Sequence, residues 1–90
     1  MFSNRPSMYF VYALQSLKRP YIYVGMSANL KQRIDRHNAG YERTTKPYRP
    51  FVLIYFEVVD TRPDARQREK YWKSASGKRK LKRIANRMGF

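Results

Sequence analysis

The side chains best suited to chemistry are gathered in one stretch, from Tyr21 to His37. Within it, Tyr23 supplies a hydroxyl, Arg33 a guanidinium and His37 an imidazole. The stretch is interpreted as a short strand that leaves through a tight turn at a glycine and enters a helix. On that helix Arg33 and His37 are four positions apart, so they are neighbours on one face. A candidate base and a cation for developing negative charge are thereby placed in one strand-to-helix unit.

Glu69 is the other informative side chain, because it interrupts the apolar stripe of a predicted helix. A carboxylate on a face that should be buried is costly unless it is paired or binds a metal. A hard divalent ion can take one carboxylate, several waters and substrate phosphate oxygens as ligands. An ion pair is the alternative, and both remain open. The stripe is Ala65, Glu69, Trp72 and Ser76, and the candidate ion-pair partners are Arg33, Arg66 and Arg68.

Two tyrosines, Tyr12 and Tyr23, fall in two predicted neighbouring strands. A phenol is a poor base at its reference pKa of about 10. A nearby metal ion or guanidinium lowers that pKa by stabilising the phenolate. Half-buried packing in a sheet is the alternative for any one of the 8 tyrosines.

The first half of the chain predicts two strands and a helix after a loose tail at residues 1–7. The β-branched and aromatic residues from Tyr9 to Leu14, and again from Tyr21 to Val24, indicate an antiparallel pair joined by a short loop. A helix capped by Ser27 or Asn29 is expected to run to about Asn38, where Gly40 ends it.

The second half predicts a strand and two helices after an irregular basic loop at residues 41–50. The run from Phe51 to Val59 has apolar residues on both faces, which predicts a central strand covered on both sides. One helix begins after Thr61 and extends to about Ser74, and another covers about Lys78 to Met88 after a break at Ser76-Gly77. The loop residues suited to phosphate contact are Thr44, Thr45, Lys46 and Arg49.

The resulting order, β-β-α-β-α-α, predicts a single α/β domain over residues 8–90, with three strands and helices on the faces of the sheet. The net charge is +14, from 20 Lys+Arg against 6 Asp+Glu, which indicates a polyanionic partner and above all nucleic acid. An anionic membrane surface and an RNA-coating role are the alternatives. Cysteine is absent, and neither a membrane span nor an export leader is recognised, so we expect a reducing, cytoplasmic setting.

The ordered motifs resemble the GIY-YIG nuclease superfamily over about residues 8–80. They are most similar to small stand-alone members related to the N-terminal nuclease domain of the bacterial excinuclease UvrC. The ordered set at this spacing is more specific than either tyrosine tripeptide alone. The motifs are Phe10-Val-Tyr12-Ala-Leu14, Tyr23-Val-Gly25, Asn29-Leu30-x-x-Arg33-x-x-x-His37-Asn38 and Arg68-Glu69-Lys70.

The resemblance implies a three-stranded antiparallel sheet flanked by helices, and hydrolysis of DNA phosphodiesters, in repair or structure-selective processing, with one Mg²⁺ or Mn²⁺ ion. Carried over by position, Tyr12 or Tyr23 activates or orients the attacking water, and Arg33 stabilises the phosphate. Glu69 holds the metal, and His37 donates to phosphate or assists proton transfer. Gly25 allows close packing, and Asn29 caps the helix. The expected DNA-binding cations are Lys31, Arg36, Lys46, Arg49, Lys70, Lys78, Arg79 and Lys80.

Two positions depart from the pattern. Phe10 stands where the first tripeptide usually has glycine, and Met26 stands where the excision-repair relatives usually have lysine. The second change removes a cation next to Gly25. The alternative function is a non-catalytic, basic DNA- or RNA-binding module of the same fold. The expected partner of the nuclease is DNA, in branched, nicked or damaged form.

Overall fold

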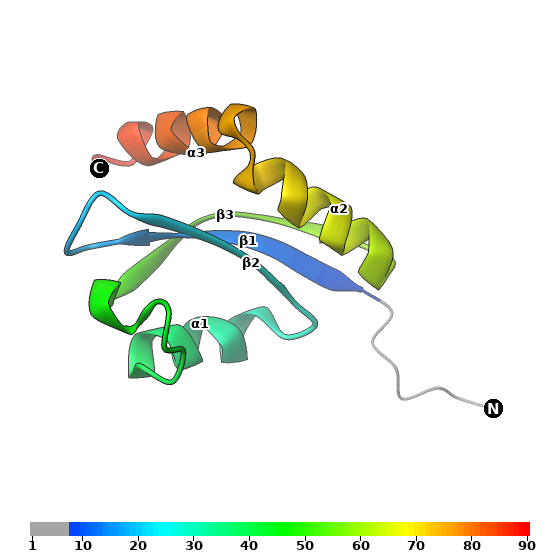
Figure 1. Cartoon of the computed structure of the whole chain (residues 1–90), viewed down its shortest axis with the longest axis horizontal. Helices are drawn as coiled ribbons and strands as arrows, with labels where there is room; N and C mark the ends of the chain where they lie inside the picture. Colours follow the sequence, from blue (N-terminus) through cyan, green and yellow to red (C-terminus); the bar gives the residue numbers. More distant parts are fainter. Residues whose placement is uncertain (1–7) are drawn as a thin grey trace.

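The computed structural model describes residues 8–90, so the tail predicted at residues 1–7 lies outside the described part of the chain. A three-stranded sheet separates one helix on one face from two helices on the other (Figure 1). The order β-β-α-β-α-α and the antiparallel sheet are as predicted. The elements are β1 (Tyr9–Ser16), β2 (Ile22–Ser27), α1 (Leu30–Ala39), the 3-10 helix η1 (Lys46–Tyr48), β3 (Phe51–Val59), α2 (Arg62–Lys73) and α3 (Ala75–Arg87).

The strand order is β2-β1-β3, so the prediction that Phe51–Val59 is the central strand is wrong. β1 is central and pairs antiparallel with both neighbours. β3 is apolar on both faces because helices lie on both sides of the sheet, and such coverage does not require a paired strand at each edge. At its far end the cover stops, and Phe56 and Val58 are 48% and 47% exposed.

The side chains of β1 alternate between two cores, as the pleat requires. Tyr12 and Leu14 face α1 and pack with Phe51. Val11 and Ala13 face the other helices, where the core also contains Val24, Ile54, Ala65, Trp72, Leu81 and Ala85. Tyr12 and the polar groups of α1 therefore lie on one face of the sheet, and the long basic helix α3 lies on the other.

Helix α1 is bounded as the sequence predicts. The Asn29 side chain caps its first turn by accepting a hydrogen bond from the Gln32 backbone N–H. Gly40 ends it in the left-handed conformation, with φ of 85°. Its buried side includes His37, with Leu30 and Ile34 half-buried against the sheet.

The break between α2 and α3 comes at Ser74, earlier than the predicted break at Ser76-Gly77. Ser74 ends α2, and its hydroxyl accepts from the Gly77 N–H to cap α3. Gly77 is instead a packing position inside the first turn of α3, because a Cβ there would clash with the Tyr71 carbonyl oxygen. A serine cap thus outweighs a nearby glycine as the boundary signal.

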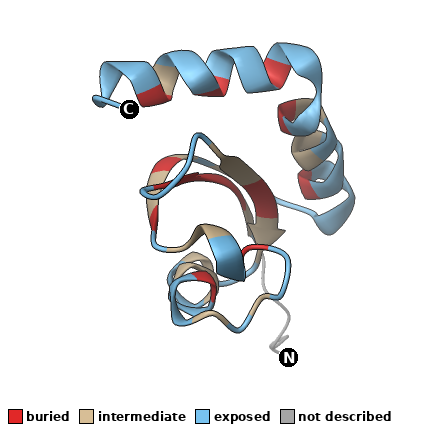
Figure 2. Cartoon of the chain, turned by 60° about the vertical axis from the view of Figure 1, so that its left-hand side comes forward, coloured by how far each residue is buried: buried red, intermediate tan, exposed pale blue. Residues whose placement is uncertain are grey.

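Helix α3 buries one stripe and exposes the rest (Figure 2). Leu81 and Ala85 are buried as predicted, whereas Met88 at the end of the predicted stripe is 48% exposed. The exposed positions are mostly Lys and Arg, so this helix presents a basic outer surface. Among residues 8–90, no helix combines the length and apolar character that crossing a membrane demands.

Candidate functional site

A chain of hydrogen bonds joins β1, α1 and the loop that follows α1. The Tyr12 hydroxyl lies 3.1 Å from His37 Nε2, and His37 Nδ1 lies 2.8 Å from the Thr45 hydroxyl. All three residues are 1% exposed. Thr45 is therefore a buried partner of the histidine, and the expectation that it contacts phosphate is wrong.

The second partner of Thr45 determines the proton positions in this chain. The Thr45 hydroxyl also reaches the Glu42 carbonyl oxygen, which can only accept. The hydroxyl thus donates to that carbonyl and accepts from His37 Nδ1–H. His37 Nε2 is left with a lone pair that accepts from the Tyr12 O–H. Burial lowers the pKa of His37, which favours this neutral imidazole.

Gly25 makes room for Tyr12 and does not form a turn. It lies inside β2, directly opposite Tyr12 in the β1–β2 pairing. A Cβ at this position would lie 2.7 Å from the Tyr12 hydroxyl oxygen and 2.8 Å from Cε2 of Tyr23. The sequence interpretation of Gly25 as a tight exit from the strand is therefore wrong, since the strand continues to Ser27. The glycine lets two phenol rings approach each other over the sheet.

Tyr12 and Tyr23 are neighbours, with ring centroids 6.3 Å apart, but their surroundings differ. Tyr12 is fully buried, whereas Tyr23 is only half-buried. Burial raises the pKa of both hydroxyls; for Tyr23 the next cause is the negative charge of Glu69, and the Arg33 charge lowers the pKa. The charges of Glu69 and Arg33 act on the pKa of Tyr12 as well, so the two tyrosines differ in burial and not in which charges reach them.

Arg33 is held by a carboxylate that the sequence analysis did not single out. Its Nη1 donates to Glu42 Oε1 at 2.9 Å, and Arg36 Nε donates to the same oxygen at 3.2 Å. Hydrogen bonds from Arg36 and then Arg33 are the main lowering causes behind a depressed Glu42 pKa. One of the five N–H groups of Arg33 is used in this way, which fixes the guanidinium while leaving donors for an anionic ligand.

Glu69 has a single cationic contact in the described part of the chain, Lys73 Nζ at 3.3 Å, one helical turn away. Its side chain is 20% exposed. The predicted ion-pair alternative named other partners, and of these Arg33 binds Glu42 while Arg68 binds Glu57. Most of the acceptor capacity of this half-buried carboxylate is therefore free.

A divalent ion fits Glu69 only if other ligands come from outside the protein. Residues 8–90 contain no group of three or more His, Cys, Asp or Glu side chains placed to hold a metal. Mg²⁺ suits this situation, because it keeps several waters and binds through one or two carboxylates together with substrate phosphates. The half-buried, largely unpaired carboxylate is compatible with such a site.

The cations expected to bind DNA do not form one patch. Lys31 and Arg36 lie on α1, and Lys46 and Arg49 lie just before β3, where Arg49 Nη1 donates to the Ala39 carbonyl. The remaining ones are on α2 and α3, across the sheet. Lys31 pairs with Asp35, and Lys80 donates to the Tyr71 hydroxyl. The second group is Lys70, Lys78, Arg79 and Lys80.

Met26 packs into the core under α2 and α3, and its side chain is half-buried there. The neighbouring Gly25 lies against the two phenol rings on the other face. Position 26 therefore lies on the face of β2 turned away from Tyr12, and the methionine adds apolar contact there.

The sequence did not point to Glu42 as a site residue, and it suggested phosphate contact for Thr45, which is instead a partner of His37. Glu42 is the only Asp or Glu between Asp35 and Glu57. A lone acid in a basic loop, shortly after two arginines on a helix, is a signal for an ion pair. No comparable signal marks Thr45, because its contact with His37 depends on how the loop folds back over α1.

Comparison with known proteins agrees with the order of elements and the motif positions. The family model described as "GIY-YIG catalytic domain" matches residues 8–82. Since this match covers most of the chain, the protein belongs to the GIY-YIG family. It therefore carries a nuclease-type domain, and nucleases with this domain generally use divalent metal ions and act on DNA.

Within this family, the chain is similar to small proteins named UPF0213. One from Pediococcus acidilactici is 42% identical over 69 residues, covering 72% of this chain and 69% of the relative. One from Staphylococcus haemolyticus is 40% identical over 67 residues, covering 73% and 82%. One from Clostridium perfringens is 35% identical over 81 residues, covering 89% and 86%.

Proposed function

We propose that this protein is a divalent-metal-dependent endonuclease that hydrolyses DNA phosphodiester bonds, in repair or in structure-selective processing of branched, nicked or damaged DNA. The proposal depends above all on the surroundings of the Glu69 carboxylate. This carboxylate is half-buried, has one cationic contact in residues 8–90, and acts electrostatically on Tyr23. The net charge of +14 supports a polyanionic substrate.

Tyr23 is the hydroxyl that we assign to the attacking water. It is half-buried, whereas Tyr12 is 1% exposed and already donates to His37. Tyr12 and His37 form a fixed layer beneath Tyr23, whose ring centroid lies 4.7 Å from that of His37. In this assignment Tyr12 and His37 are positioning residues, and Tyr23 contacts the reacting water.

Arg33 is assigned to the scissile phosphate. Its guanidinium is fixed by Glu42 and retains donors for phosphate oxygens, and developing charge on those oxygens strengthens the interaction. Glu69 would hold the metal ion, which when bound lowers the pKa of a water ligand and neutralises phosphate charge. The basic residues of α1 and of the segment before β3 would contact the DNA backbone on the same side.

The direct test offers nicked, flapped and branched DNA to the purified protein with Mg²⁺ or Mn²⁺, and with a chelator as the control. We expect metal-dependent cleavage that is lost with the chelator. Tyr23→Phe should reduce kcat by about 10²-fold, because the Tyr23 hydroxyl contacts the reacting water in this assignment. Tyr12→Phe should reduce kcat by less, because Tyr12 does not contact that water. DNA binding of equal affinity with and without metal, together with no cleavage, would instead support the non-catalytic binding module.

A further inference from the structure

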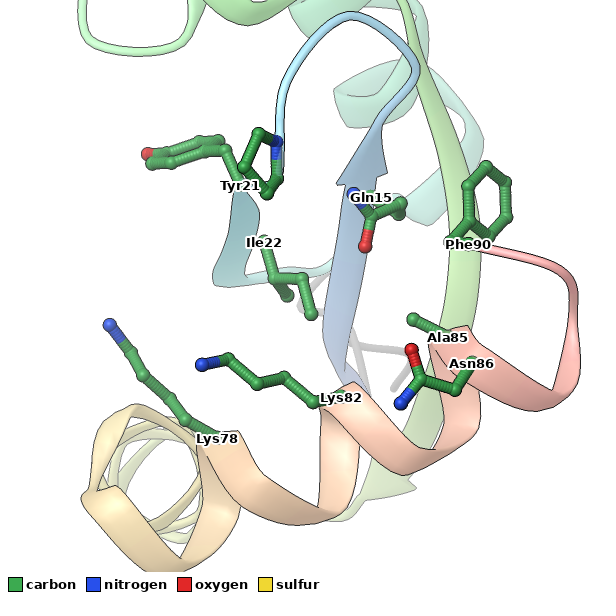
Figure 3. A pocket seen from close by; sticks show the side chains of 9 residues that line it. Gln15, Tyr21, Ile22, Lys78, Lys82, Ala85, Asn86 and Phe90 are labelled. Carbon is green, nitrogen blue, oxygen red and sulfur yellow. The ribbon is translucent and has the colours of Figure 1, made fainter.

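A cavity of about 430 Å³ lies between the β1–β2 hairpin and α3, on the face of the sheet opposite to the two tyrosines. Figure 3 shows Lys78 and Lys82 reaching from α3 toward the start of β2, with Gln15 and Phe90 on the other side of the opening. The apolar part of the lining comes from residues of the hairpin, β2 and α3. They include Pro20, Ile22 and Ala85.

Gln15 is a buried polar group of this cavity with an unused acceptor. It is 6% exposed, and its side-chain nitrogen donates to the Ser16 and Arg19 carbonyl oxygens, at 3.0 and 3.4 Å. Those two acceptors determine the orientation of the amide, since a carbonyl can only accept. The Gln15 Oε1 atom faces the cavity (Figure 3) and has no protein partner among residues 8–90. A ligand with an N–H donor would satisfy it.

Lys78 and Lys82 give the cavity its charge. They are exposed, four positions apart on α3, and neither has a carboxylate partner in the described part of the chain. The two ammonium groups extend along the same side of the opening (Figure 3). An anion held there would be adjacent to an apolar floor and to the Phe90 ring, which is 44% exposed.

We propose that this cavity binds a nucleoside phosphate, either free or as one nucleotide of a single strand. The phosphate lies between Lys78 and Lys82, and an N–H on the base edge donates to Gln15 Oε1. The flat base lies over the apolar floor beside Phe90, where aromatic contact is tolerant of sequence. The volume falls within the range of small-ligand sites. This site is independent of the cleavage chemistry proposed above.

The test is a set of titrations of the full chain, monitored by NMR. The ligands are a mononucleotide, inorganic phosphate and a short single-stranded oligonucleotide. We expect shifts at the Gln15 side-chain amide and the Ile22 methyl groups with both nucleotide ligands. Saturation by the oligonucleotide at a far lower concentration than by the mononucleotide identifies a strand as the source. The reverse order identifies a free nucleotide.

Matched variants separate this site from general charge attraction. Lys78→Ala with Lys82→Ala should weaken nucleotide binding by about tenfold or more. Arg83→Ala with Arg87→Ala, the same charge change at the same spacing on α3 but outside the lining, should have little effect. Gln15→Leu should weaken the nucleotide but not inorganic phosphate. Equal losses in the two double variants, or no shift at Gln15 with any nucleotide ligand, would overturn the proposal.

Discussion

Helix α2 contributes to two clusters around carboxylates whose surroundings differ. Glu57 on β3 accepts from Tyr55 Oη at 2.7 Å, from Trp72 Nε1 at 2.9 Å, and from two nitrogens of Arg68. Glu69, next to Arg68 in sequence, has one cationic contact among residues 8–90, Lys73 Nζ at 3.3 Å. Within residues 8–90, one carboxylate accepts four hydrogen bonds and the other has a single contact.

The difference separates a structural role from a ligand-binding role. Hydrogen bonds from Arg68 are the main cause that lowers the pKa of Glu57 to about 2. The guanidinium also lies over the Tyr71 and Trp72 rings, which ties β3 to α2. Glu57 accepts three hydrogen bonds at Oε1 and one at Oε2, whereas Glu69 has one contact among residues 8–90, so Glu69 has more acceptor capacity left for an ion. The number of donors around each acid, more than its burial, indicates which one is available to a metal.

The substitution Glu69→Gln should have the largest effect, and that effect should be on the rate of DNA cleavage. The change removes the charge that would hold the metal ion, so kcat should fall by about 10³-fold. The free energy of unfolding should change little, since a single contact to Lys73 is lost. Cleavage assays paired with chemical denaturation measure both quantities. Unchanged cleavage would remove Glu69 from the chemistry.

Glu57→Gln should have the opposite pattern. An amide cannot accept from Arg68 as a carboxylate does, and the guanidinium and Trp72 N–H lose their charged partner. We expect a loss of about 2 kcal/mol in the free energy of unfolding, measured by denaturant titration. The metal dependence of cleavage should persist in the folded variant. A loss below about 0.5 kcal/mol would show that the cluster contributes little.

Acid should remove the Glu57 contribution gradually. Its pKa in the folded protein, about 2, is below the ordinary value of 4.5. The carboxylate therefore contributes its full stabilisation above pH 4.5 and loses it as the pH falls toward 2. The difference in unfolding free energy between the wild-type protein and Glu57→Gln should shrink over this window. A difference that stays constant down to about pH 2.5 would contradict the assignment.

Thr45→Val should have a smaller effect, confined to the candidate site. The variant keeps the shape but cannot accept from His37 Nδ1, so the preference for one tautomer is lost. We expect kcat to fall by about tenfold, with rescue by Thr45→Ser. Imidazole ¹⁵N shifts should show the proton leaving Nδ1 in part. An unchanged tautomer in the valine variant would show that Thr45 does not set it.

Local patterns predicted the elements of this fold, but the arrangement of the elements was predicted less well. Asn29 and Gly40 bound α1 through contacts within a few residues, which sequence spacing captures. The position of β3 depends on which strand pairs with each edge of β1. The apolar residues of β3 do not encode that pairing. The apolar pattern of a strand indicates whether its faces are covered, not whether its edges are paired.

Hydrogen-bond partners in the candidate site depended on tertiary folding. Spacing correctly placed Arg33 and His37 on one helix, and motif order brought attention to Tyr12 and Glu69. The partners of His37 and Arg33 come from the loop after α1, and no periodicity describes a loop. Glu57 was interpreted only as part of an apolar strand, although an acid within such a run requires a partner as much as Glu69 does.

The most direct test of the contrast between the two carboxylates is to measure Mn²⁺ binding by electron paramagnetic resonance. The samples are the wild-type protein, Glu57→Gln and Glu69→Gln. A non-cleavable oligonucleotide supplies the phosphate ligands in each sample. We predict that Glu57→Gln binds Mn²⁺ as the wild-type protein does, whereas Glu69→Gln binds it at least about tenfold more weakly. Equal binding by Glu69→Gln and the wild-type protein, or a loss specific to Glu57→Gln, would contradict the assignment of Glu69 as the metal ligand.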